Sequence, residues 1–191
     1  MEFIQQSIQD VILIKPKILG DERGYFVETF HQDRFEEAVG HKINFIQDNE
    51  SKSSKGVLRG LHFQLPPFAQ SKLVRVIAGL VLDVAVDIRQ DSPSYGKFVT
   101  AKLSAENKHQ MFVPRGFAHG FVVLSKTAIF AYKVDNYYAP EHDRGLAFDD
   151  STLGIDWQLP IDQLKLSEKD QKQPRLVNLD SGFEFGLDYY V

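Results

Sequence analysis

The feature that most constrains the fold of this chain is a succession of short apolar runs separated by turn residues. From residue 73 to residue 134 these runs are rich in β-branched and aromatic side chains, and Gly, Pro, Asn and Asp punctuate them. No helix-length segment intervenes, which disfavours a parallel α/β sheet. The pattern therefore predicts a mainly β protein with strands at Leu73–Ala78, Leu80–Ile88, Phe98–Leu103, Gln110–Val113, Gly120–Leu124 and Ala128–Val134.

The segments on either side extend this prediction. Residues 11–19 and 24–30 have the composition of strands, and Asp33–Val39 followed by Gly40 is typical of a short helix with a C-terminal glycine. From Val81 to Asp87 the odd positions are partly polar and the even ones apolar, which indicates the wall of a sandwich or barrel. After Asp149 the chain becomes more polar, and we expect short helical pieces there that pack on the β unit, at Ile161–Leu164 and Ser167–Lys172.

Composition limits the possible chemistry. With 191 residues and no cysteine, the chain is expected to form one domain over residues 1–191, without a disulfide, a thiolate metal site or a cysteine nucleophile. The 22 basic and 26 acidic residues leave a net charge of −4, which predicts neither a nucleic-acid nor a membrane partner. No signal-type apolar region opens the sequence, and no apolar run approaches the ~20 residues of a membrane span. We therefore expect a cytoplasmic protein.

Two clusters of polar residues stand out among apolar neighbours. The first, between Gly56 and Gly79, contains Arg59, His62, Gln64 and Lys72. On an extended segment His62 and Gln64 share one face, and Arg59 joins them only if the chain bends, for which Gly60 is the obvious place. The alternative interpretation is structural: His62 would be a hydrogen-bonded core histidine, and Lys72 would bury its aliphatic stem and extend its ammonium to solvent.

The second cluster, Val113–Phe121, contains Pro114, Gly116 and His119. Together the two clusters resemble the paired motifs of the cupin barrel. This resemblance implies a mainly β fold, a cupin-type double-stranded β-helix (jelly-roll barrel) with a few short peripheral helices, with its barrel core at about residues 20–150 and helical pieces at about 151–191.

The chain departs from the metal-binding cupins where their ligands would stand. Only His62 and His119 match the ligand set, Gln64 is a weak ligand, and Lys72 places a cation where a carboxylate would bind. We therefore expect no metal and no other cofactor. An ammonium at Lys72 could instead stabilise a developing oxyanion.

Four longer strings carry a closer resemblance: DERGYFVETF, QDNESKSSKGVLRGLHFQ, QSKLVRVIAGLVLDVAVDIRQDSPSYGK and VPRGFAHGFVVLS. Over about residues 20–170 the chain resembles the dTDP-4-dehydrorhamnose 3,5-epimerase family. The resemblance implies an isomerase that inverts C3 and C5 of dTDP-4-dehydro-6-deoxy-D-glucose, giving dTDP-4-dehydro-L-rhamnose for dTDP-L-rhamnose synthesis. It also implies a homodimer, for which strand exchange by an N-terminal segment such as Ile12–Leu19 would suit the architecture.

The same resemblance implies roles for four catalytic residues. His62 is the base, supported by Asp170; Lys72 holds the enolate oxygen, and Tyr132 donates the proton on the opposite face. Asp170 also fits a helix start with Ser167, and the spacing of Tyr132 is equally that of a core residue. By resemblance, the nucleotide sugar is bound by Lys72 together with Arg23, Phe26, Glu28, Gln47, Asp48, Asn49, Arg59, His119, Tyr138, Asp143 and Lys169.

Three other functions are open from the sequence. The nearest is a single-position epimerase acting on a related dTDP-4-ketosugar. The second is a metal-dependent cupin oxygenase, which a stoichiometric metal would reveal. The third is a sugar-nucleotide binding module without catalysis, in which His62 would be structural.

Overall fold

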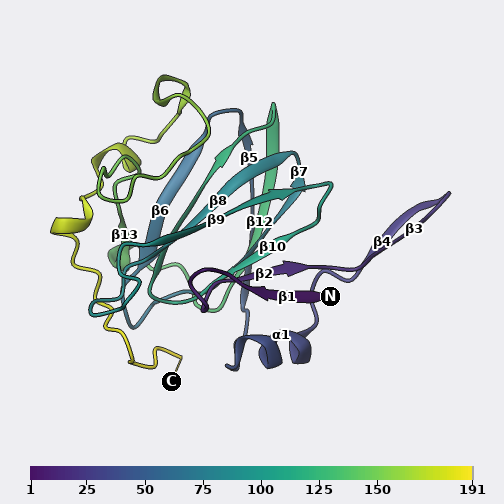
Figure 1. Cartoon of the computed structure of the whole chain (residues 1–191), viewed down its shortest axis with the longest axis horizontal. Helices are drawn as coiled ribbons and strands as arrows, with labels where there is room; N and C mark the ends of the chain where they lie inside the picture. Colours follow the sequence, from purple (N-terminus) through teal and green to yellow (C-terminus); the bar gives the residue numbers. More distant parts are fainter. Residues whose placement is uncertain (191) are drawn as a thin grey trace.

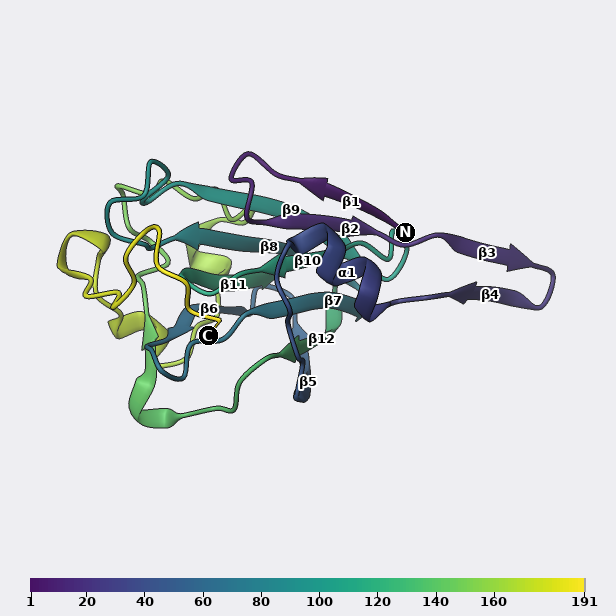
Figure 2. The same cartoon turned by 90° about the horizontal axis from the view of Figure 1, so that it is seen from below.

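Two antiparallel sheets lie face to face and make up most of the molecule (Figure 1). The structure is a computed structural model that describes residues 1–190. The six-stranded sheet has the order β1-β2-β10-β7-β12-β5, and the five-stranded sheet has the order β13-β6-β11-β8-β9. Strands β3 and β4 form a separate hairpin that projects from the body (Figure 2). The mainly β jelly-roll architecture is confirmed.

The strands are short and the helical elements few. The strands are β1 (Glu2–Gln5), β2 (Ile12–Lys15), β3 (Ile18–Asp21), β4 (Gly24–Val27), β5 (Gln47–Ser54), β6 (Leu58–Gln64), β7 (Lys72–Ala78), β8 (Leu80–Asp87), β9 (Phe98–Ser104), β10 (Gln110–Val113), β11 (Phe117–Val123), β12 (Thr127–Val134) and β13 (Asp143–Gly145). The helical elements are α1 (Gln32–Val39) and the single 3-10 turns η1 (Pro140–His142), η2 (Ile161–Gln163), η3 (Asp170–Lys172) and η4 (Leu176–Asn178). Within residues 1–190 no helix is long and apolar enough to cross a membrane.

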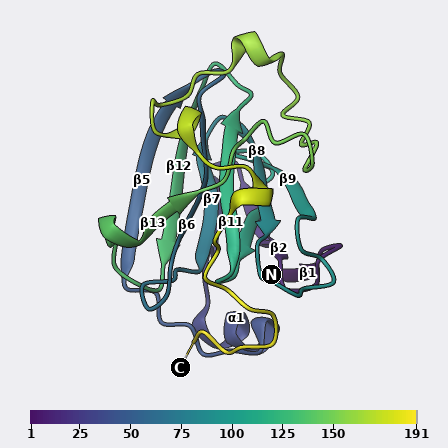
Figure 3. The same ribbon diagram turned by 90° about the vertical axis from the view of Figure 1, so that its left-hand side faces the viewer.

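Both faces of the five-stranded sheet are buried. The odd residues Val81 and Ala85 of β8 belong to the core between the two sheets, whereas Leu82, Val84 and Val86 belong to a second core on the outer face. The segment after β13 covers that outer face (Figure 3) and contributes Leu146, Leu153, Trp157, Leu176 and Phe183. The partly polar face predicted for Val81–Asp87 is thus the barrel interior, and its polar residue Asp83 is fully buried.

Helix α1 packs on the outer face of the six-stranded sheet. Its buried Phe35 packs edge-on against Phe112 of β10, with ring centroids 5.2 Å apart, and completes a third core with Ile12 and Ile14. Gly40 ends the helix in the left-handed conformation, with φ of 79°, which a glycine adopts without strain. The predicted helix and its glycine cap are confirmed.

Several predicted boundaries are wrong for identifiable reasons. Residues 11–19 form two strands rather than one, because Pro16 lacks an N–H and lies where β2 ends. The strand predicted at 24–30 ends at Val27, and the barrel begins before residue 20 because β1 and β2 are part of the six-stranded sheet. Strands β1, β5 and β13 were not predicted. The helical piece predicted at Ser167–Lys172 is only the turn η3.

A β-bulge at Gly60 directs two side chains of β6 to the same face. His62 pairs with His119 while Arg59 pairs with Phe121, so three steps along β6 match two along β11. The bend predicted at Gly60 is confirmed. Gly60 has a φ of 134°, and a Cβ there would lie 2.5 Å from the Cα of Gly120. The bulge therefore requires glycine for both its conformation and the close approach of the strands.

We expect Gly60→Ala to lower the free energy of unfolding by about 2–4 kcal/mol, because it adds steric overlap of about 1–3 kcal/mol to backbone strain of about 1 kcal/mol. Gly24→Ala is the matched control, since Gly24 has a similar φ of 126° but open space around its Cβ position. The control should lose only about 1 kcal/mol. Urea unfolding of both variants measures the difference, and equal losses would contradict the close-approach explanation.

Candidate functional site

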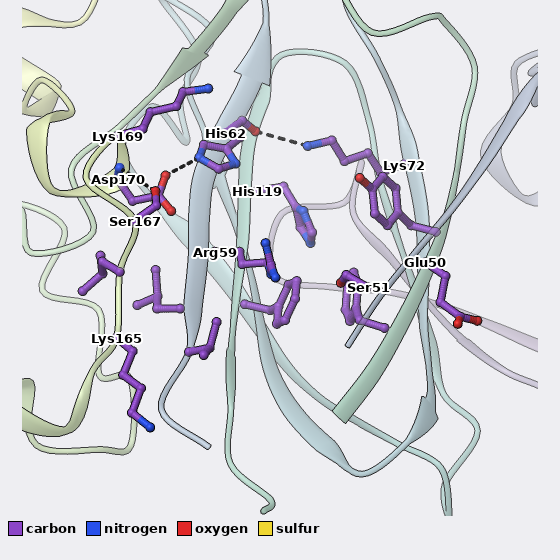
Figure 4. A pocket seen from close by; sticks show the side chains of 16 residues that line it. Glu50, Ser51, Arg59, His62, Lys72, His119, Lys165, Ser167, Lys169 and Asp170 are labelled. Carbon is purple, nitrogen blue, oxygen red and sulfur yellow. Dashed lines mark hydrogen bonds and ion pairs between the residues drawn. The ribbon is translucent and has the colours of Figure 1, made fainter. Parts of the chain in front are cut away.

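A cavity of about 500 Å³ opens between the two sheets (Figure 4). His62 and His119 line it from β6 and β11 of one sheet, and Lys72 and Tyr132 line it from β7 and β12 of the other. The segment before and within η3 closes the side. The full lining consists of Glu50, Ser51, Val57, Leu58, Arg59, His62, Lys72, His119, Phe121, Phe130, Tyr132, Lys165, Leu166, Ser167, Lys169 and Asp170.

His62 and Asp170 form a hydrogen-bonded pair at the cavity wall. The distance from His62 Nε2 to Asp170 Oδ1 is 2.5 Å, and the side chains are 31% and 5% exposed. Burial raises the pKa of Asp170, but the hydrogen bond and the charge of His62 outweigh it and hold the pKa below its usual value. With Nε2–H donating to this carboxylate, Nδ1 is the nitrogen that carries the lone pair.

The structure also accounts for the alternative interpretation of Asp170. Its backbone N–H donates to Ser167 Oγ at 3.1 Å, as a helix start would. The same residue therefore begins η3 through its backbone and holds His62 through its side chain.

Lys72 places an ammonium group on the opposite wall. Its Nζ donates to the backbone carbonyl of His62 at 3.3 Å. Burial lowers the pKa of Lys72 to about 8, although the negative charges of Asp143 and Asp83 act in the other direction. The group is thus mainly protonated at neutral pH but poorly solvated, which strengthens its attraction for an anion in the cavity.

His119 lies deeper and has its own carboxylate partner. Its Nε2 is 3.0 Å from both carboxylate oxygens of Asp83, and the side chains are 7% and 0% exposed. Burial lowers the pKa of His119 and raises that of Asp83, while the attraction between them opposes both shifts. A second histidine–aspartate pair is therefore built into the interior next to the first.

Tyr132 extends the interior core into the cavity. It packs against Phe130, with ring centroids 6.1 Å apart, so it has contacts typical of a core residue as well as a position in the lining. Burial raises the pKa of its phenol, while the charge of Arg59 acts in the other direction. The phenol is therefore protonated at neutral pH and can act as a proton donor.

Three further predicted residues form a polar cluster beside the cavity. Asp143 accepts hydrogen bonds from the hydroxyl of Tyr138, at 3.0 Å, and from the ammonium of Lys169. Only Lys169 of the three lines the cavity. The cavity lining holds four basic side chains, Arg59, Lys72, Lys165 and Lys169, against the acidic side chains of Glu50 and Asp170. This excess of cations favours an anionic ligand.

The residues predicted on β5 do not line this cavity. Gln47 donates to Asn49 at 2.9 Å, and Asn49 lies opposite Tyr132 in the strand register. Asp48 forms an ion pair with Lys133 at 2.9 Å and, because side chains alternate along a strand, lies on the other face of the sheet. It borders a second hollow, of about 260 Å³, that also includes Asn49.

The residues predicted near the β3–β4 hairpin also lie outside the cavity. Arg23 pairs with Asp21 in the turn of the hairpin, Phe26 is 68% exposed, and Glu28 contacts Arg34. The hairpin points away from the barrel (Figure 1). Within a single chain these three residues cannot reach a ligand in the cavity.

Some residues at or beside the cavity have no prediction from the sequence. Asp83 lies behind the lining and bonds His119; a charged residue in an apolar strand, placed diagonally to a histidine on the next strand, is a recognisable signal for it. Glu50, Ser51 and Lys165 had no such signal, because polar residues in polar segments are usually only solvated.

The donor set of this cavity does not fit a metal ion. The lining offers two histidines and two acidic side chains, Glu50 and Asp170, among four basic ones, and Lys72 brings its positive charge next to His62. Gln64 is buried outside the lining, where its amide bonds the backbone of Phe68, Tyr137 and Ala139. Over the described part of the chain no group of three His, Asp or Glu side chains is placed to hold a metal.

Known proteins share this architecture and sequence. Residues 5–178 match the family model described as dTDP-4-dehydrorhamnose 3,5-epimerase. An enzyme of that name from Shigella flexneri is 53% identical over 94% of this chain and 98% of its own. The crystal structure of a dTDP-6-deoxy-D-glucose-3,5-epimerase from Legionella pneumophila, in complex with dTDP-4-keto-L-rhamnose, is 50% identical with a TM-score of 0.90, over 94% of this chain and 95% of that one.

A 3′-monoepimerase from Streptomyces bikiniensis, in complex with dTDP-quinovose, is more distant. It is 32% identical with a TM-score of 0.84 and covers 90% of this chain and 86% of its own. The shared fold and the interior site define the class as carbohydrate epimerases built on a cupin-like barrel, which are isomerases. Within that class the chain belongs to the dTDP-4-dehydrorhamnose 3,5-epimerase family.

We expect Lys72→Met to raise the free energy of unfolding at pH 7 by up to about 3 kcal/mol, because it removes a poorly solvated charge and keeps an unbranched side chain only one atom shorter. The folded-state pKa of about 8 lies below the 10.5 of an ordinary lysine, so the unfolded state binds more protons between these values. The wild type therefore gains stability as the pH rises through that window, and its difference from the variant should shrink.

Urea unfolding at pH 7 and pH 10 measures this effect. The exposed Lys102 on β9 provides the control variant Lys102→Met, which should change stability by less than about 0.5 kcal/mol at either pH. A Lys72→Met protein less stable than the wild type at both pH values would contradict the burial cost.

Proposed function

We propose that this protein epimerises dTDP-4-dehydro-6-deoxy-D-glucose at C3 and C5 and yields dTDP-4-dehydro-L-rhamnose. The observation that carries the proposal is the arrangement of a carboxylate-supported histidine on one wall of the cavity with an ammonium and a phenol on the other. Relatives named dTDP-4-dehydrorhamnose 3,5-epimerase are about 50% identical to this chain, and the match covers nearly their whole length. A related structure holds dTDP-4-keto-L-rhamnose.

In the proposed reaction His62 removes a proton from a carbon next to the 4-ketone. Asp170 orients the imidazole and stabilises the imidazolium that forms. The electron pair of the broken C–H bond moves onto the ketone oxygen, and Lys72 stabilises the resulting enolate, a contribution of roughly 3 kcal/mol for such a group. Tyr132 then donates a proton to the same carbon from the opposite face.

The positive lining supports a place for the diphosphate. Arg59 shares a face with His62 because of the bulge at Gly60, and Lys169 lies close by on the η3 segment. We propose that these two cations, with His119, bind the anionic part of the substrate near the catalytic pair. Tyr138 and Asp143 remain proposed contacts of the nucleotide, as do Gln47 and Asn49 on β5.

We propose that the protein acts as a homodimer. The β3–β4 hairpin exposes Ile18, Leu19, Tyr25 and Phe26, which is a large apolar surface for a projecting element. A second copy could bring Arg23, Phe26 and Glu28 of one chain to the cavity of the other. The Ile12–Lys15 part of the segment proposed for exchange pairs with β10 of its own chain, so the exchanged element would be the hairpin. A cytoplasmic location is likewise a proposal.

A second candidate function is epimerisation at one carbon only. It is supported by the similarity to the Streptomyces 3′-monoepimerase, whose structure has the same fold at 32% identity. The higher identity to 3,5-epimerases favours the double inversion.

Incubation with dTDP-4-dehydro-6-deoxy-D-glucose in D₂O tests both candidates. Because each inversion replaces a carbon-bound proton with one from solvent, we expect deuterium at both C3 and C5 of the product by NMR. Label at C3 or C5 alone would identify a single-position epimerase. Absence of label at both carbons would refute epimerisation of this substrate.

We expect Asp170→Asn to lower kcat by on the order of 10²-fold or more with little change in KM, because an amide supports the wrong tautomer of His62 and cannot stabilise an imidazolium. The exposed Asp162 in η2 provides the control Asp162→Asn, which should retain kcat. Steady-state kinetics at neutral pH measure both variants. A fully active Asp170→Asn protein would show that the pair is structural.

A further inference from the structure

Lys72 stands at the point where three strands of the six-stranded sheet end. It is the first residue of β7, and it pairs with Val113, the last residue of β10, and with Val134, the last residue of β12. The loop before it runs from Leu65 to Ser71 without strand pairing. The backbone that carries the ammonium is therefore at the margin of the sheet, where pairing alone constrains it least.

Residues within two positions of those three strand ends are hydrogen-bonded to one another. Asp135 accepts the backbone N–H of Ser71 on Oδ1, at 2.7 Å, and the hydroxyl of Ser71 on Oδ2, at 2.6 Å. Arg115 donates to the same Oδ2 through Nε at 3.1 Å. The Asp135 side chain is only 3% exposed. We call Ser71, Arg115 and Asp135, with Tyr190, the strand-end cluster.

Tyr190 brings a distant part of the chain into this cluster. Its hydroxyl oxygen accepts the backbone N–H of Arg115 at 3.2 Å, and the Arg115 guanidinium lies 4.9 Å from its ring centroid. Arg115 Nη1 also donates to the carbonyl of Tyr189. Burial raises the pKa of Tyr190 to about 12, so its hydroxyl is neutral in the working range. The segment after Phe185 is thus fastened to the margin of the sheet beside Lys72.

None of the strand-end residues lines the main cavity, so they cannot contact the substrate there. Lys72, in contrast, has few contacts of its own: its ammonium makes one hydrogen bond, to the His62 carbonyl, and no ion pair within the described residues. A lysine side chain is long and flexible. With a single hydrogen bond at the ammonium end, the backbone at the other end is the remaining constraint on where the charge lies.

We propose that Asp135 is a positioning residue for Lys72, and that Tyr190, acting through Arg115, completes the fixation. In this arrangement the buried carboxylate of Asp135 fixes Ser71, the residue before Lys72, through two hydrogen bonds. The ammonium of Lys72 is thereby kept next to the position where the enolate oxygen forms. The inference rests on the proposed role of Lys72 in the reaction.

The test compares two buried carboxylates of similar structural importance. Asp87, fully buried at the end of β8, accepts hydrogen bonds from Arg89, Ser92 and Ser94 and has no contact with Lys72. Asp135→Asn and Asp87→Asn should both lower the melting temperature. At a temperature where both are folded, we expect Asp135→Asn to lower kcat by about tenfold or more with KM changed by less than about twofold, because a small displacement of a catalytic group has a large effect. Asp87→Asn should keep kcat within about twofold of the wild type.

A kcat of Asp135→Asn within about twofold of the wild type would overturn the proposal, as would equal losses in both variants. If Asp135→Asn does not fold, Tyr190→Phe is decisive, because it removes only the oxygen that accepts the Arg115 N–H. We expect it to lower kcat by roughly two- to fivefold, and an unchanged kcat would overturn the proposal. Deuterium incorporation by the wild type is measured in parallel, so that failure of the proposed function is recognised independently of these variants.

Discussion

The five-stranded sheet is apolar on both faces, and the rest of the structure depends on keeping both faces from water. The six-stranded sheet covers one face and forms the interior core. The other face is covered by the segment that follows β13, through side chains such as Trp157, Leu176 and Phe183. Burial of apolar surface is the dominant favourable contribution to folding, so this packing holds the segment on the five-stranded sheet. Its course over the sheet also brings Asp170 to His62.

The site uses the interior of the barrel, where a charge is costly unless it has a partner. His62 and His119 are each bonded to a carboxylate, and Asp143 holds Lys169. Lys72 has no carboxylate bonded to it among the described residues; its ammonium makes a single carbonyl contact, and burial lowers its pKa. A poorly solvated ammonium destabilises the fold but interacts strongly with an anion formed beside it. Poor solvation of the Lys72 ammonium therefore lowers the stability of the fold and at the same time strengthens its interaction with the enolate.

The sequence predicted most of the central strands because their signals are local. β-Branched and aromatic runs between turn residues located β7 to β12 closely, and Gly60 correctly marked the bend that brings Arg59 beside His62. Strand β5 escaped prediction because its sequence QDNESKSS is polar; it is a strand because β12 pairs with it along its whole length. Because β5 is polar on both faces, its alternation does not show which residues face the cavity. Asp48 faces away from it, together with Lys133.

By itself, the sequence determined the class of fold, the turn and bulge positions and the type of chemistry available, because side-chain period, glycine conformation and residue chemistry are properties of short segments. Only the tertiary structure decided which apolar face of β8 is the barrel interior and how Asp170, which no local pattern links to His62, reaches it from 108 residues away. It also decided that the β3–β4 hairpin projects away from the cavity of its own chain and contributes no residue to the lining. These outcomes depend on which surfaces pack together, and no short segment contains that information.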